Sequence, residues 1–371
     1  MKIDNFKVEE WFNEYEKFAK YNLADVCIDS MTINELLDLS TENMDYIFSK
    51  KMTYGDIQGS LRLKNAISSL YKKQSIDNIT VAHGAIGANQ LVFLSLLESE
   101  DEVIAVLPAY QQHYSIPQSL GANVKYLFLK PENNWLPDVD ELKELVTTKT
   151  KLITITNPNN PTGAVIEDDL MQEIVDIAKE NDTYILVDEV YRNIVSDKKY
   201  ETTSIVDLYE KGVATSSLSK AFSLAGLRVG WIVANQSVIK EVNHQREYNT
   251  ISVSMLDDYL ASIAIENKDK IFTRNIQKRN IGLNILKNWV EKESHIECVI
   301  PNGGTTAFLK YTLNMSSYDL CKMLLKDTGI LFLPGETLEM DGYLRMGYCN
   351  FPDKLKRALD IFSEWILINN N

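Results

Sequence analysis

From about residue 54 to residue 235, short apolar runs alternate with amphipathic helical patterns. Such alternation is typical of a parallel β-sheet wrapped by helices. The runs predict strands at 78–82, 101–107, 124–129, 152–156, 183–187, 212–216 and 230–234. Because open α/β sheets bind ligands at the carboxyl ends of their strands, we expect the functional loops to follow these strands.

The segments before and after this region predict further helices and a second, smaller unit. Val8, Trp11, Phe12 and Tyr15 recur at helical spacing and predict an N-terminal helix that packs on a larger body. After residue 237 a long charged helical stretch runs to residue 290 as a connector. The remaining pattern predicts an α+β unit, with strands near 297–301, 307–311 and 343–347 and helices near 318–327 and 352–369.

These patterns together predict an α/β fold with two domains of unequal size. A chain of 371 residues, 45% of them hydrophobic, is long enough to bury a sizeable core. We expect an N-terminal helical segment, 1–45, that belongs to the small domain. A large sheet domain follows over 46–270, and the rest of the small domain occupies 271–371.

Charge and residue usage exclude several classes of function. The net charge of −14 and the pI of about 4.9 repel a phosphate backbone, so we do not expect nucleic acid as a partner. The N-terminus does not resemble a signal peptide and no run is long enough for a membrane span, which predicts a soluble, cytoplasmic protein. Four cysteines and four histidines lack metal-ligand spacing, so we expect reduced structural thiols and no metal.

One lysine in the stretch 216–231 is surrounded by hydroxyl groups and a second cation. Lys220 follows Ser217 and Ser219, and Arg228 comes eight residues later. A lysine amine forms a Schiff base with an aldehyde, whereas hydroxyls and an arginine bind a phosphate. An aldehyde that carries a phosphate points to pyridoxal phosphate. The alternative is a serine-rich turn before a solvated Lys/Arg pair on an ordinary helix.

Two polar loops follow predicted strands and supply further candidates. Residues 157–163 read NPNNPTG, a turn whose asparagine amides either only tighten the loop or also contact a ring hydroxyl. In the sequence DEVY, Asp188 and Tyr191 bring a carboxylate and a phenol to the end of another strand. A buried carboxylate needs a partner, which is either a structural arginine or backbone amide, or the protonated ring nitrogen of a cofactor.

Two more stretches offer an anion site and a stacking ring. GAIGAN, at 84–89, lies between a predicted strand and a predicted helix at 90–97, and small residues there expose backbone N–H groups to an anion. It does not match GxGxxG and so does not support a dinucleotide site. Tyr110 follows another strand and either stacks on a planar ring or simply packs in the core.

The motifs recur in a fixed order along the chain: YGDIQGSLRLKNAI with Tyr54, GAIGAN, Pro-x-Tyr at Tyr110, NPNNPTG, DEVY, SLSK with Arg228, and LRMGY with Arg345. This set covers nearly the whole chain and resembles the fold-type I pyridoxal-phosphate enzymes of the class I/II aminotransferase family. The resemblance implies aminotransferase fold type I, in which a large, mostly parallel seven-stranded sheet domain binds pyridoxal 5′-phosphate and a smaller α+β domain adjoins it. The implied activity is that of a transaminase.

The resemblance also implies a role for each candidate residue. Lys220 would hold the cofactor as an aldimine and then move the proton between the substrate Cα and the cofactor. Asp188 would keep the pyridine nitrogen protonated, Tyr110 would stack on the ring, and Asn160 and Tyr191 would contact its phenolic oxygen. The implied phosphate ligands are Ser217, Ser219, Arg228 and the backbone of Ala85 and Ile86.

Two further residues complete the implied site. Arg345 would grip the α-carboxylate of the substrate in a bidentate fork, with Asn160 beside it. Tyr54 would reach the cofactor from a neighbouring subunit, which implies a homodimer with shared active sites. The catalytic set implied by the resemblance is Lys220, Asp188 and Tyr191, and the partners are an amino acid and a 2-oxo acid.

The chain departs from the family pattern before Tyr54. It reads CIDSMTI at 27–33, where the common pattern has a glycine-containing loop over the substrate. The opening VEEWFNEYEKFAKYN and the INELLDL helix resemble the capreomycidine synthase-like branch, whose members use the same cofactor for elimination and ring closure. Arg246 lies near a stretch that contributes to the pocket in related enzymes, yet no second arginine is assigned to a side-chain carboxylate. Aspartate specificity therefore does not follow.

Three functions remain open at this point. The first is transfer of an amino group from an L-amino acid to a 2-oxo acid. The second is a pyridoxal-phosphate lyase or cyclase, which expels or replaces a β-substituent. The third is a non-catalytic regulator that binds the cofactor. Such regulators carry an added DNA-binding domain, for which this acidic sequence has no spare segment before its first motif.

Overall fold

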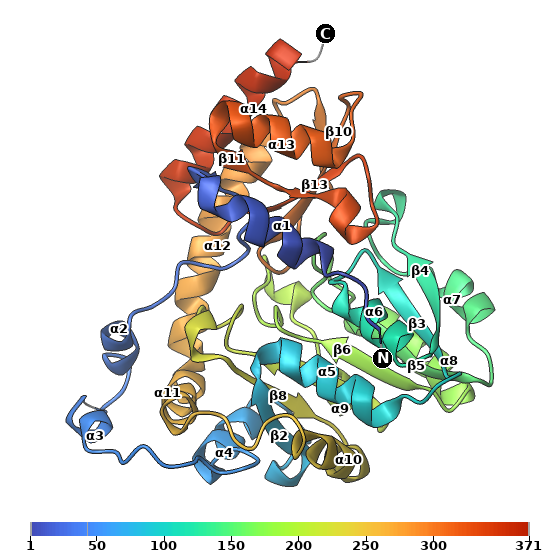
Figure 1. The fold of residues 1–371 in the computed structure, drawn as a ribbon, viewed down its shortest axis with the longest axis vertical. Helices are drawn as coiled ribbons and strands as arrows, with labels where there is room; N and C mark the ends of the chain where they lie inside the picture. The colour runs from blue at the N-terminus through green and yellow to red at the C-terminus, as the bar shows by residue number, and fades with distance from the viewer. Residues whose placement is uncertain (1, 43, 370–371) are drawn as a thin grey trace.

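The computed structural model describes residues 2–42 and 44–369, and its centre is one seven-stranded sheet (Figure 1). The strand order is β2-β8-β7-β6-β5-β3-β4. Neighbouring strands are parallel except at β8, which runs antiparallel to both β2 and β7. The strands are β2 (Ile79–His83), β3 (Glu102–Leu107), β4 (Asn123–Phe128), β5 (Thr150–Thr156), β6 (Tyr184–Asp188), β7 (Gly212–Ser217) and β8 (Val229–Val233). The predicted mostly parallel sheet is confirmed, because all seven strands form within two residues of their expected bounds.

Helices pack around this sheet through single apolar faces. In α8 (Asp168–Glu180), Met171, Ile174, Val175 and Ala178 are buried and recur at helical spacing, so one side of the helix lies against the core. The other surrounding helices are α4 (Leu61–Ser68), α5 (Gly84–Leu96), α6 (Gln112–Ser119), α7 (Val139–Leu145), α9 (Ile205–Leu208), α10 (Gln236–Arg246) and α11 (Met255–Glu266). Within residues 2–42 and 44–369, no helix has both the length and the apolar character needed to cross a bilayer.

Two helix predictions were wrong in their bounds. GAIGAN is the start of α5, which begins at Gly84 and not at residue 90, because its small residues allow the helix to form directly against β8. The stretch 237–290 is divided between α10, α11 and the long α12 (Lys268–Val290). The Ser254 hydroxyl accepts a hydrogen bond from the Asp257 N–H and so caps a new helix start at α11.

The smaller unit is built from both ends of the chain. Its sheet has the order β12-β13-β10-β9 and is antiparallel, and a separate parallel pair joins β1 to β11. The elements are α1 (Lys7–Tyr15), β1 (Tyr21–Asn22), β9 (Ile296–Glu297), β10 (Thr306–Tyr311), α13 (Ser317–Thr328), β11 (Ile330–Leu331), β12 (Leu333–Pro334), β13 (Tyr343–Gly347) and α14 (Pro352–Asn369). The domain limits 1–45, 46–270 and 271–371 stay a prediction.

Short elements complete the chain. Helices α2 (Ile33–Leu37) and α3 (Met44–Phe48) form an arm that runs beside α12 and α11 toward α4 (Figure 1). The 3-10 helices are η1 (Glu16–Phe18), η2 (Ile76–Asn78), η3 (Pro131–Asn133), η4 (Lys198–Tyr200), η5 (Ala225–Leu227) and η6 (Gly335–Leu338).

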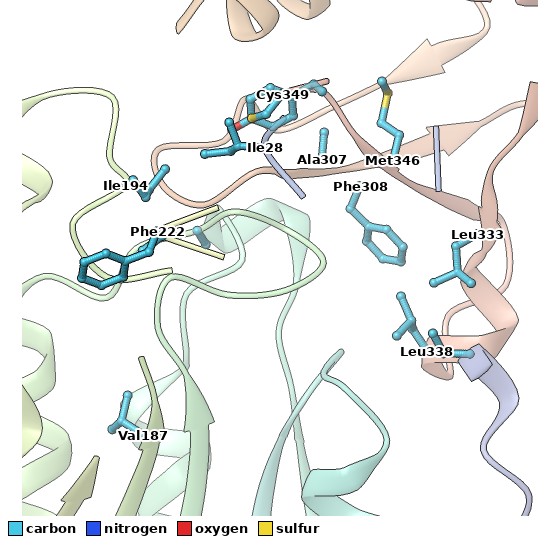
Figure 2. Packing of buried hydrophobic residues seen from close by; sticks show 14 of the residues in the cluster. Ile28, Val187, Ile194, Phe222, Ala307, Phe308, Leu333, Leu338, Met346 and Cys349 are labelled. Carbon is cyan, nitrogen blue, oxygen red and sulfur yellow. The ribbon is translucent and has the colours of Figure 1, made fainter. Parts of the chain in front are cut away.

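One hydrophobic cluster joins the two units. Val187 and Ile194 from the large sheet and its loops belong to the same cluster as Phe308 and Leu333 of the small sheet. Figure 2 shows Ile194 and Phe222 on loops beside the strands that carry Ala307, Phe308 and Met346. Because this cluster is continuous, the loops after the large sheet are held against the small sheet, and the groove between the two is a fixed feature of the fold.

Gly230 allows the start of α5 to approach β8. A Cβ atom at Gly230 would lie 2.3 Å from the Gly84 carbonyl carbon and 2.8 Å from the Ala85 nitrogen. Both contacts are with backbone, which cannot move aside without shifting the helix. The first turn of α5 is therefore positioned by the absence of a side chain in β8.

We expect Gly230→Ala to lower the free energy of unfolding by about 1–3 kcal/mol, because the added methyl group overpacks two backbones. Gly226→Ala is the matched control, since a Cβ there meets nothing within 4 Å. Urea unfolding followed by circular dichroism measures both variants. Equal stability of the two would contradict the close-approach role of Gly230.

Candidate active site

A cavity of about 480 Å³ opens where the carboxyl ends of the large-sheet strands meet β13 and α1. All the residues predicted for the site line it except Tyr54, whose side chain lies elsewhere on the surface and is 81% exposed. The predicted residues that line the cavity are Ala85, Ile86, Tyr110, Asn160, Asp188, Tyr191, Ser217, Ser219, Lys220, Arg228 and Arg345.

One end of the cavity gathers groups that bind anions. Ala85 and Ile86 lie in the first turn of α5, where backbone N–H groups have no partner inside the helix. Ser217 ends β7, and its hydroxyl accepts a hydrogen bond from the Ser219 N–H at 3.2 Å. The Arg228 guanidinium donates to the Ser219 hydroxyl at 3.5 Å. Hydroxyls, amides and a guanidinium together form a corner suited to an anion such as a phosphate.

Asp188 ends β6 and is almost fully buried. Its Oδ1 accepts a hydrogen bond from the Val190 N–H at 3.1 Å, and its Oδ2 accepts one from the Asn89 amide at 2.9 Å. The His113 ring nitrogen Nε2 lies 3.7 Å from the same Oδ2. Of the two structural partners considered for this carboxylate, the structure provides the backbone amide, while the carboxyl group still lines the cavity.

Asn89 holds Asp188 through a chain of side-chain hydrogen bonds. The Thr215 hydroxyl donates to Asn89 Oδ1, which leaves the Asn89 NH₂ group to face the carboxylate. The same NH₂ donates to Gln112 Oε1 at 3.3 Å, and Gln112 donates in turn to the Ile86 carbonyl at 2.6 Å. These hydrogen bonds connect the first turn of α5, in the anion-suited corner, to the carboxylate. Asn89 is therefore a positioning residue.

Lys220 lies in the loop after β7, beside two groups that carry acidic protons. Its Nζ donates to Cys27 Sγ at 3.5 Å. Burial lowers the pKa of the lysine, but Tyr191, Cys27 and Asp25 outweigh that effect and raise the pKa above its usual value. Burial also raises the pKa of the Tyr191 phenol and of the Cys27 thiol, so both keep their protons near neutral pH.

Arg345 enters the cavity from β13 and is 2% exposed. It donates from Nη1 to Asn160 Oδ1 at 3.3 Å and from Nη2 to the Ala24 carbonyl at 3.1 Å. The other two asparagines of NPNNPTG hold the loop: Asn157 bonds the backbone of Ile166, and Asn159 donates to the Pro108 carbonyl. Asn160 is thus the asparagine of this loop that faces the cavity.

Unpaired buried atoms show what the cavity is able to hold. The Tyr191 hydroxyl and Arg345 Nε are buried and make no hydrogen bond. An unpaired buried polar group carries a free-energy penalty, which an oxygen of a bound molecule removes. Tyr191 faces this cavity beside Lys220, and Arg345 faces it beside Asn160. A hydroxylated ring with a phosphate and an amino-acid carboxylate fit these groups.

The aminotransferase class I and II family model matches residues 29–362. The chain belongs to this family. It is 39% identical to a pyridoxal-phosphate-dependent aminotransferase of known structure from Streptococcus suis 89-1591, with a TM-score of 0.96 and complete coverage of both chains. The family and this neighbour make pyridoxal phosphate the cofactor of the chain, in agreement with the prediction from Lys220 and its neighbours.

Two curated relatives carry different names. Capreomycidine synthase from Streptomyces vinaceus is 30% identical over 363 residues, which cover 96% of this chain and 92% of that protein. Aspartate aminotransferase from Thermotoga maritima is 28% identical over 338 residues, which cover 88% and 86% of the two chains. The predicted resemblance to the family is confirmed. The chain is similar both to an enzyme named as a synthase and to one named as an aminotransferase.

Three side chains at the site were missed from the sequence. Asn89 was read only as part of a backbone anion site, Cys27 as a structural thiol, and Glu9 was not considered; all three reach the cavity or Lys220. Arg246, considered for the pocket, is buried instead and donates to the carbonyls of Val81 and Ile251. A polar Asn89 among the small and apolar residues of α5 was the available signal.

We expect Asn89→Leu to weaken cofactor binding by about 10- to 100-fold, because Asp188 loses a hydrogen bond made to a charged group. The dissociation constant for pyridoxal phosphate is measured by titrating the cofactor-free protein and following absorbance. Gln90→Leu, the next residue of α5 and not part of the cavity, should bind as the wild type does. Unchanged binding by Asn89→Leu would remove Asn89 from the positioning role.

Proposed function

We propose that the protein transfers an amino group from an L-amino acid to a 2-oxo acid. The observation that supports this most directly is the meeting of three groups in one cavity: the Lys220 amine, the unpaired Tyr191 hydroxyl and the unpaired Arg345 Nε. An amine and a carboxylate-binding guanidinium in one enclosed space are what a reaction at the Cα of an amino acid requires.

Each end of the substrate has a matching group. Arg345 binds the α-carboxylate, using Nε together with an Nη atom, and Asn160 fixes the plane of the guanidinium. Lys220 Nζ, displaced from the cofactor by the substrate nitrogen and so present as a neutral amine, would accept the Cα proton and return it on the other side of the transferred nitrogen. Pyridoxal phosphate, when bound, supplies an electron-accepting ring that stabilises negative charge at Cα.

The remaining residues orient the cofactor. Asp188 pairs with the ring nitrogen and is itself fixed by Asn89. Tyr191 would donate a hydrogen bond to the ring oxygen, since its raised pKa keeps it a phenol. The phosphate is bound at the start of α5, where Ser217, Ser219 and Arg228 converge.

A second candidate is elimination or cyclisation on the same cofactor. The observation that favours it is the 30% identity to capreomycidine synthase, which extends over 96% of this chain and therefore includes the divergent N-terminal segment. Both reactions begin with removal of the Cα proton by Lys220. The two reactions differ in where the electron pair left at Cα goes afterwards: to the cofactor for amino transfer, or toward a β-leaving group for elimination. The residues around Cα do not by themselves determine which of the two follows.

Half-reaction analysis separates the two candidates. Holoenzyme is mixed with single amino acids, and we expect the aldehyde form of the cofactor to convert to its amine form with release of one 2-oxo acid per site. A 2-oxo acid added afterwards should reverse the change. Lys220→Ala should abolish both steps. Release of a β-leaving group, with the aldehyde form of the cofactor regenerated, would support elimination. Cofactor binding without any turnover would support the non-catalytic regulator.

We also propose a homodimer in which Tyr54 completes the site of the neighbouring subunit. The segment around Tyr54 lies beside residue 253, because a Cβ at Gly55 would be 3.0 Å from the Val253 carbonyl oxygen. Large exposed apolar side chains gather on these two segments: Met52, Tyr54, Ile57, Tyr248 and Ile251. Exposed apolar groups of this kind mark surfaces that bind other chains.

Subunit mixing tests the shared site. Lys220→Ala and Tyr54→Ala proteins should each be inactive or strongly impaired. After co-refolding, half of the dimers are mixed and each has one intact site, so activity should return to about one quarter of the wild-type value. Light scattering checks the dimer. Activity no higher than the mean of the two separate variants would place Tyr54 outside the neighbouring site.

A further inference from the structure

Helix α1 forms one wall of the active-site cavity and is fastened to both units. On the small unit, the Trp11 indole donates to the Phe332 carbonyl at 3.0 Å. On the large unit, the Lys7 N–H donates to Gln111 Oε1 at 2.8 Å, and Gln111 donates back to the Asn5 carbonyl. In Figure 1, α1 lies between β13 and α6, across the space that separates the two units. The wall is therefore a fixed part of the cavity.

The residues that α1 contributes to the cavity are Val8, Glu9 and Phe12. Glu9 Oε1 accepts a hydrogen bond from the Tyr110 hydroxyl at 2.6 Å. The pKa of Tyr110 is raised well above its usual value by burial and by Glu9, so Tyr110 remains the donor. Within the described part of the chain, Glu9 Oε2 has neither a hydrogen bond nor an ion pair. One carboxylate oxygen is left to a bound molecule.

The other charged residues that line the cavity already have a role in the proposed function or a hydrogen-bond partner in the protein. The cations that line it in the described residues are Lys220, Arg228 and Arg345, which serve the Schiff base, the phosphate and the α-carboxylate. Asp188 faces the ring nitrogen. Asp25 accepts hydrogen bonds from the Cys27 N–H of its own turn at 2.9 Å and from Asn350, which follows β13, at 3.4 Å. Glu9 is the lining carboxylate without an assignment.

This balance of charge selects among substrate side chains. A second carboxylate on the substrate would be repelled by Glu9, and no lining cation is left to pair with it. A cation on the substrate side chain would instead be attracted to Glu9. The apolar surfaces of Val8 and Phe12 and the ring of Tyr110 can cover an aliphatic stem. Arg246, the other arginine considered for the pocket, is buried against backbone carbonyls and does not line the cavity.

We propose that Glu9 selects amino acids whose side chain ends in a cation, a guanidinium or a primary ammonium group. The side-chain cation pairs with Glu9 while the α-carboxylate pairs with Arg345. This inference rests on the proposed function, because it assumes that an amino acid is the molecule in the cavity. It assigns substrate choice to the first helix of the chain.

Binding titrations with charge-matched amino acids test the proposal. L-Arginine is compared with its neutral analogue L-citrulline, L-lysine with L-norleucine, and L-glutamate is added as the acidic member. Binding to holoenzyme is followed by the change in cofactor absorbance, which reports an amino acid at the site whichever reaction follows. We expect the cationic member of each pair to bind about two- to fivefold more tightly, as for one ion pair with an exposed carboxylate.

Three variants assign the preference to Glu9. Glu9→Gln keeps an acceptor for Tyr110 but removes the charge, and should bring the arginine-to-citrulline ratio close to one while citrulline binding stays as it was. Glu9→Lys should shift the preference toward L-glutamate. Glu10→Gln is the control, since Glu10 is an exposed acidic neighbour on α1 that does not line the cavity.

Two results would overturn the role of Glu9 but leave the proposed function standing. They are tighter binding of L-glutamate than of L-arginine by the wild type, and a cation preference that survives in Glu9→Gln. If no amino acid changes the cofactor absorbance, the proposed function fails as well. The two failures are therefore distinguishable.

Discussion

The register of three parallel strands determines where the chemistry of this protein takes place. Thr156 of β5 pairs with Asp188 of β6, and Asp188 pairs with Thr215 of β7, so β5 and β6 end at one level and β7 ends two residues beyond it. The loops that follow the carboxyl ends of these neighbouring strands lie at the same edge of the sheet. For this reason Asn160, Tyr191 and Lys220 line one cavity although they are far apart in sequence. A shift of one strand by a single residue would turn the Asp188 carboxylate to the opposite face of the sheet.

The sequence was sufficient to predict most of the residues that line the cavity, because they lie in loops whose turn residues and strand ends are local signals. NPNNPTG and DEVY follow strands that are apolar enough to predict directly. Asn89 was missed for the opposite reason. It lies inside a helix, and its function depends on Thr215 and Asp188, which only the tertiary packing brings beside it. The misplaced start of α5 has the same cause, since Gly230 makes room for it from another strand.

The residues that we propose for the cofactor and for substrate choice come from different parts of the fold. The large sheet supplies those proposed for the ring and the phosphate, while β13 supplies Arg345 and α1 supplies Glu9. No local pattern predicts that a glutamate on an N-terminal amphipathic helix faces a cavity, because its neighbour Glu10 has the same local context and faces solvent. This separation allows relatives with one set of cofactor motifs to differ in the molecules they act on.

The pairing of the two ends of the chain has a consequence for the order of assembly. Trp11 bonds to Phe332, 321 residues later, and β1 pairs with β11. During synthesis the large sheet is complete well before β11 leaves the ribosome, so α1 can contact Gln111 early but gains its contact with Phe332 only when the last strands form. The wall that α1 adds to the cavity is therefore completed only at the end of folding. A chain whose C-terminal unit is incomplete has most of the large-sheet loops that line the cavity but lacks Arg345.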